Sequence, residues 1–182
     1  MKMFSVLISL LLITTTWAYG QHETETHDNS HFQHHRLALF TGYGLIPGAI
    51  NESGKEQVKV IPVLGIDYEY WFNHKIALGL HNDLELASYS VENEKEKYLE
   101  REYAFVTALV FLYEPLRGLT FFAGPGYEFE KNHNFAVFKI GTDLTKSFKQ
   151  GWSTGITLSY DVKEVNSSFS FGLCIGKRLG KH

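Results

Sequence analysis

The chain has 182 residues, with 17 basic and 20 acidic side chains and a formal net charge of −3. This balance argues against a nucleic-acid-binding protein, because such proteins carry a basic excess that neutralises phosphates. The only cysteine is Cys174, which excludes an intramolecular disulfide. The length is sufficient for one domain.

Residues 1–20 have the features of a secretory signal peptide. Lys2 provides a positive start, Phe4 to Ile13 form an apolar run, and Ala18 and Gly20 place small residues three and one before Gln21. The apolar run is shorter than the ~20 residues that a membrane-spanning helix needs. We therefore expect export and cleavage after Gly20.

Residues 21–35, "QHETETHDNSHFQHH", form a polar leader that holds five of the nine histidines: His22, His27, His31, His34 and His35. The segment has no apolar periodicity, so we expect it to be disordered. Imidazole is a common ligand for zinc, nickel and copper, so weak, exchangeable metal binding is one interpretation. A solvated spacer is the favoured one, because no helical or CxxC arrangement would fix a site. No other cofactor is expected.

From residue 36 to residue 180 apolar residues alternate with small or polar ones, which is the period of a β-strand. Eight such segments follow one another: Arg36–Ile46, Val60–Phe72, Lys75–Tyr89, Glu102–Glu114, Leu119–Glu130, His133–Phe148, Trp152–Asp161 and Ser168–Leu179. Most exceed the usual strand length of about 5–6 residues in soluble domains. They suit transmembrane strands, which need about 9–11 residues.

Connections between these segments alternate in length. Short ones lie at Asn73–His74, Pro115–Gly118 and Lys149–Gly151, and the others are longer or more polar. Together they predict an all-β fold, an eight-stranded antiparallel up-and-down transmembrane β-barrel. Pro125 lies within a predicted strand and indicates a bulge there.

The alternation does not say which face points inward, so a secreted lipocalin-like barrel or a sandwich fits it equally well. Aromatic residues at the strand ends and the signal peptide favour a membrane barrel with the apolar face outward. The opposite face then lines the lumen with small and charged residues. Its predicted polar network, plugged by ion pairs, is Arg36, Asp67, Glu69, His81, Asp83, Glu85, Lys139, Asp143 and Arg178.

Two stretches carry a resemblance to known proteins. "LTFFAGPGYEFEKNHNFAVFKIGTDL" (Leu119–Leu144) and the final "FGLCIGKRLG" (Phe171–Gly180) resemble an uncharacterised bacterial outer-membrane β-barrel family. In architecture the chain is similar to small eight-stranded OmpA/OmpX-like barrels. The resemblance implies an outer-membrane location with both termini in the periplasm. It also implies contact with outer-membrane lipid and with the barrel-assembly machinery, and a single copy rather than an oligomer.

Three functions remain open at this point. The favoured one is a structural or surface-interaction role with a mostly plugged lumen, and the first alternative is a small conduit for ions or small solutes. The second alternative is a lipid-modifying enzyme. Deacylases among small membrane barrels carry a His-x-Ser pair, in which the histidine activates the hydroxyl. Neither candidate histidine matches this pattern, because His81 is followed at that spacing by Asp83 and His133 by Phe135. We therefore expect no catalytic site.

His81, Asp83 and Glu85 share one strand face and are a weaker candidate for a metal site. Glu92–Glu102, with mixed charges, is predicted to be a solvated outer loop.

Overall fold

The computed structural model describes residues 32–50, 55–91, 99–131, 134–164 and 166–180. The chain divides into two units, residues 1–30 and 31–182, and the first lies outside the described residues. The predicted signal peptide and His22, His27 and His31 are therefore not described. Among the described residues, no helix is long and apolar enough to cross a membrane.

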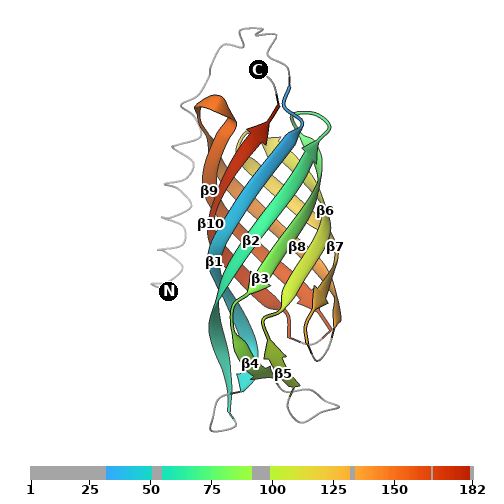
Figure 1. The fold of residues 1–182 in the computed structure, drawn as a ribbon, viewed down its shortest axis with the longest axis vertical. Helices are drawn as coiled ribbons and strands as arrows, with labels where there is room; N and C mark the ends of the chain where they lie inside the picture. The colour runs from blue at the N-terminus through green and yellow to red at the C-terminus, as the bar shows by residue number, and fades with distance from the viewer. Residues whose placement is uncertain (1–31, 51–54, 92–98, 132–133, 165, 181–182) are drawn as a thin grey trace, which may run out of the picture. The chain divides into compact units, whose positions relative to one another are not determined.

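The described residues form an antiparallel β-barrel (Figure 1). Its strands are β1 (His35–Ile50), β2 (Glu56–Trp71), β3 (Ile76–Glu85), β4 (Ser88–Val91), β5 (Leu99–Glu102), β6 (Phe105–Leu116), β7 (Leu119–Phe129), β8 (Phe135–Ser147), β9 (Trp152–Lys163) and β10 (Ser168–Leu179). Each barrel strand pairs with its neighbour, and β1 pairs with β10 from His35–Leu179 to Leu45–Phe169, which closes the barrel. The predicted eight-stranded antiparallel barrel is confirmed: β1, β2, β3 and β6 to β10 form the wall, and β4 and β5 are a further hairpin.

The outward face is apolar along every strand, as predicted. Leu39, Leu80, Leu109 and Leu173 are 56%, 43%, 50% and 63% exposed, although each lies in the middle of a strand. The inward face differs from the prediction, because it contains large apolar side chains as well as small and charged ones. The interior of an eight-stranded barrel is narrow enough to be filled by side chains, and large apolar side chains fill the volume that the charged ones leave.

The two ends of the barrel differ. One end, which we call the short-turn end, carries the turns Phe72–Lys75 and Arg117–Gly118 and the 3-10 turn Lys149–Gly151. The opposite end, which carries β4 and β5, is the loop end (Figure 1). Both ends of the described chain lie at the short-turn end, where the Gln33 side chain donates a hydrogen bond to the Gly180 carbonyl (3.3 Å).

Two expectations about local structure are wrong. The leader does not extend to residue 35, because His35 begins β1 and the His34 carbonyl accepts a backbone hydrogen bond from Trp71 (2.7 Å). Pro125 does not mark a bulge. Pairing of β6 with β7 passes from Ala108–Gly126 to Phe111–Ala123 without a shift of register, and the irregularity lies at Tyr113/Leu116 instead. The proline is tolerated because Pro125 points outward and its neighbours Gly124 and Gly126 let β7 lie close to β6.

Candidate functional site

The hairpin of β4 and β5 lies across the loop end of the barrel. Beyond Leu45, β1 has no partner in β10, and Ala49 and Ile50 instead pair with Val91 and Ser90 of β4. The same two residues of β1 pair with β2 on their other edge. Gly48, with φ +72°, lies in the bulge that directs this end of β1 toward β4. The hairpin thus occupies the edge that β10 leaves free, on the far side of β1 from β2 (Figure 1).

An apolar cluster fills the lumen beneath the hairpin. Its members come from β1, β2, β4 and β8, and all are at least nine-tenths buried: Phe40, Ile46, Ala49, Ile61, Val63, Tyr89, Val91 and Phe135. Burial of this apolar surface stabilises the hairpin, at about 25 cal/mol for each Å² removed from water. The loop end is therefore packed as a protein core.

Arg101 of β5 anchors the hairpin to the barrel wall. It is 1% exposed, and its guanidinium carbon lies 5.6 Å from the ring centroid of Tyr89 and 5.3 Å from that of Phe135. The guanidinium forms an ion pair with Glu128 of β7, whose side chain is also fully buried. The charge of this arginine is thus paired with a carboxylate, and its planar guanidinium lies close to two aromatic rings inside the barrel.

The ion pair continues into a chain of polar contacts. Lys163 of β9 lies 2.5 Å from Glu128 and 3.2 Å from Glu85, and the Tyr89 hydroxyl donates to Glu85 (2.9 Å). Burial raises the pKa of Tyr89 above its ordinary value, so the phenol stays protonated and remains a donor. The contacts join β5, β7, β9, β3 and β4, which fixes the hairpin at several points.

A second polar cluster lies at mid-height in the lumen. Lys139 is 1% exposed and its ammonium group lies 2.8 Å from Asp83 and 2.7 Å from Asp161. Asp67 and His81 border the same space, a cavity of about 10 Å³. That is room for about one water molecule.

A third cluster lies toward the short-turn end. Arg36 pairs with Glu69, which also accepts a hydrogen bond from the indole nitrogen of Trp71 (2.7 Å). The Arg178 guanidinium lies 4.7 Å from the Trp71 ring and 5.7 Å from that of Phe32. An apolar cluster of Trp71, Ala77, Ala108, Val110, Leu112 and Phe122, with Phe32 packed against it, fills the rest of this part of the lumen.

The nine residues of the predicted lumen network all belong to strands of the barrel, but they do not form one network. They separate into the three clusters, apart from Asp143, which accepts a hydrogen bond from Thr157 (2.6 Å). His81, Asp83 and Glu85 have different partners: His81 packs on Phe122, Asp83 binds Lys139 and Glu85 binds Lys163. The weaker metal candidate therefore does not form a site in this structure.

Four of these partners lie outside the predicted network. Asp161 pairs with the predicted Lys139, and Glu128 pairs with Arg101 and Lys163. Lys163 lies on β9 beyond its predicted end, and Arg101 was assigned to a solvated loop. Alternation continued past Asp161 would have placed Lys163 on the inward face. Nothing in the sequence around Arg101 indicates burial, because its position depends on the hairpin folding back over the lumen.

The two described leader histidines are engaged with the barrel. The His34 ring nitrogen Nδ1 lies 2.7 Å from the Trp71 carbonyl, and His35 Nδ1 lies 2.7 Å from the Tyr68 hydroxyl. Within the described ranges, no three His, Cys, Asp or Glu side chains are placed to hold a metal ion. Metal binding by the leader remains a prediction, since His22, His27 and His31 are not described.

Small outer-membrane proteins are among the solved structures to which this chain is similar. Two of them are Ail, the attachment invasion locus protein of Yersinia pestis, with a TM-score of 0.52 and 9% identity, and the outer membrane protein OprG from Pseudomonas aeruginosa, with a TM-score of 0.52 and 12% identity. Each match covers 81% of this chain, with 100% of Ail and 98% of OprG. Neither the protein-family models nor the curated protein sequences give a match. At these identities the similarity shows the fold, so the expected OmpA/OmpX-like architecture is confirmed.

Proposed function

We propose that this protein is a bacterial outer-membrane barrel that does not conduct and that acts through its surface, as a structural or interaction protein. The observation that carries the proposal is the closed loop end, where β4 and β5 lie over an apolar core and Arg101 is paired inside the lumen. A water-filled conduit needs a continuous polar path, and three successive layers of packed side chains interrupt it here.

The exterior of the barrel supports the proposed location. A closed barrel with an apolar outward face satisfies every backbone polar group without water, which hydrocarbon demands. Short turns are periplasmic in bacterial outer-membrane barrels. We therefore place the short-turn end and both termini in the periplasm, and the β4–β5 hairpin at the cell surface. Outer-membrane lipid and the assembly machinery are the proposed partners, and a monomer the proposed state.

Catalysis is not part of the proposal. The polar side chains of the lumen that the structure describes are mostly held in ion pairs, which leaves little room for a substrate. A lipid-modifying enzyme would also need a nucleophile beside a base on the outward face. The outward Thr107 hydroxyl instead donates to the Asn82 side chain (2.8 Å).

Planar-bilayer recordings test the central claim. The purified full chain should produce no steady conductance, whereas a porin reconstituted in parallel should produce regular steps. Regular, ohmic steps from the full chain would refute the proposal and favour the conduit. Recovery of the protein as a freely soluble periplasmic species would refute the location.

A further inference from the structure

The outward surface of β8, β9 and β10 carries a group of cationic side chains at the short-turn end. We define the cationic patch as Lys146, Lys149, Trp152 and Lys177. Lys177 is the register partner of Trp152, and its ammonium group lies 5.0 Å from the indole ring. Lys146 on β8 and Lys149 in the adjoining turn are exposed. Between residues 144 and 156, and between 175 and 180, the sequence contains no Asp or Glu.

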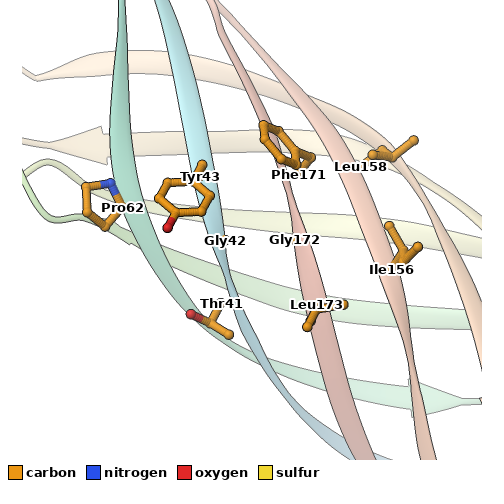
Figure 2. Close-up of a pocket in the computed structure, with 9 residues that line it drawn as sticks. All are labelled: Thr41, Gly42, Tyr43, Pro62, Ile156, Leu158, Phe171, Gly172 and Leu173. Atoms are coloured by element: carbon orange, nitrogen blue, oxygen red, sulfur yellow. The ribbon is translucent and has the colours of Figure 1, made fainter.

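An apolar groove lies on the outward surface of β1, β2, β9 and β10, so it shares β9 and β10 with the patch (Figure 2). We define the outer groove by its lining: Thr41, Gly42, Tyr43, Pro62, Ile156, Leu158, Phe171, Gly172 and Leu173. Its volume is about 550 Å³. Figure 2 shows the side chains of Tyr43 and Phe171 on one side of Gly42 and Gly172, and those of Thr41 and Leu173 on the other. Gly42 and Gly172 pair with each other at inward-facing positions, and a Cβ at either one would meet the backbone of the facing strand, so β1 and β10 lie close together beneath the groove.

The strand register makes the patch and the groove one continuous surface. On β9, Trp152, Thr154, Ile156 and Leu158 all point outward, and their partners on β10 are Lys177, Ile175, Leu173 and Phe171. The first pair belongs to the patch and the last two line the groove. From Trp152 to Leu158 the strand rises about 20 Å, or about 14 Å of depth at a tilt of ~45°. One leaflet of hydrocarbon is about 15 Å thick, half of the ~30 Å core.

We propose that this surface binds one anionic glycerophospholipid of the phosphatidylglycerol type, from the leaflet at the short-turn end. Its phosphate would lie among Lys146, Lys149 and Lys177, with Trp152 at the level of the glycerol, and an acyl chain would lie in the outer groove. Tryptophan favours that interfacial level, and lysines attract anionic headgroups. The inference rests on the proposed function in one respect, which is that the short-turn end faces the periplasm and the lipid therefore belongs to the periplasmic leaflet.

Fluorescence quenching of Trp152 provides the test. The full chain is reconstituted in vesicles in which phosphatidylglycerol or phosphatidylcholine carries bromine near the glycerol end of its acyl chains. Trp17 lies in the predicted signal peptide and is absent once that segment is removed, and Trp71 is 2% exposed and faces the lumen. Lipid bromine therefore reports mainly on Trp152, and loss of the signal in W152F verifies the reporter. We expect the full chain to favour phosphatidylglycerol over phosphatidylcholine by at least about fivefold, which is the effect of a single lysine near an anionic surface.

Matched variants separate the patch from charge in general. Lys146→Gln with Lys177→Gln should bring the preference close to one. Lys75→Gln with Arg117→Gln removes the same charge from other turns of the same end and should leave the preference intact. Equal loss in both pairs, or no preference in the full chain, would overturn the headgroup assignment.

The groove has its own variant. Thr41 faces outward, so Thr41→Phe fills the groove without entering the lumen, and it should weaken association of phosphatidylglycerol severalfold. Unchanged association would overturn the acyl-chain assignment. These outcomes are independent of the proposed function, because conductance is measured separately and a conducting barrel could still show the lipid preference.

Discussion

Lys139 provides the sharpest test of how the lumen is held together. Its ammonium group lies between two carboxylates, those of Asp83 and Asp161, at 2.8 and 2.7 Å. The lysine side chain is 1% exposed, and the two acids are 15% and 6% exposed. Lys139→Met keeps most of the volume but removes the only positive charge in contact with this pair among the described residues.

The expected loss follows from that burial. Removing one partner of a buried ion pair costs about 3–5 kcal/mol, because the remaining charge is left without compensation. Here two acids remain and repel each other, so the loss should lie in the upper half of this range. The triple variant with Asp83→Asn and Asp161→Asn removes the charges together and should recover most of the stability, since neutral replacement of a whole buried group is often tolerated.

Urea unfolding in detergent micelles measures these differences. Emission of buried Trp71 reports loss of the lumen core. Lys149→Met, in an exposed turn, serves as the control and should change the free energy of unfolding by no more than about 0.5 kcal/mol. The reasoning is refuted if Lys139→Met costs less than about 1 kcal/mol, or if the triple variant is less stable than the single one.

Three further predictions address the exterior, the hairpin and the leader. Leu80→Arg, on the outward face at mid-height, should cost about 2–4 kcal/mol of unfolding free energy in lipid, and a neutral effect would mean that this face does not meet hydrocarbon. Arg101→Ala removes the ion pair of the hairpin with Glu128 and its contacts with the Tyr89 and Phe135 rings, although Lys163 still pairs with Glu128. Limited proteolysis within β4 and β5 should therefore become at least tenfold faster, a change of about 1.4 kcal/mol; an unchanged rate would show that the arginine does not hold the hairpin. Deleting residues 22–31 should abolish any nickel or zinc binding seen by titration calorimetry and leave the melting temperature unchanged. Metal binding by the full chain should weaken as pH falls through ~6.5, because imidazole then gains a proton and no longer binds the metal. Equal binding after the deletion would place the metal elsewhere.

The sequence by itself determined the strands and their two faces. A two-residue period is visible wherever one face is continuously apolar, as along Leu64 and Ile66 of β2. Short, turn-forming connections at Asn73–His74 and Lys149–Gly151 then imposed an antiparallel order. These are local properties, so they can be read from neighbouring residues, and the strand count and the lumen-facing positions followed from them.

Only the tertiary structure decided the pairing inside the lumen and the closure of the loop end. Alternation shows that Lys139 points inward, but which acids meet it depends on the register across the barrel, and Asp161 lies on a different strand from Asp83. Arg101 belongs to a segment whose composition indicates solvent exposure, yet it is buried. Its hairpin pairs with Ala49 and Ile50, about 40 residues before their partners Val91 and Ser90, and covers apolar side chains from both halves of the barrel. Burial of this kind arises from long-range contacts, which outweigh local composition because they remove a large apolar area from water.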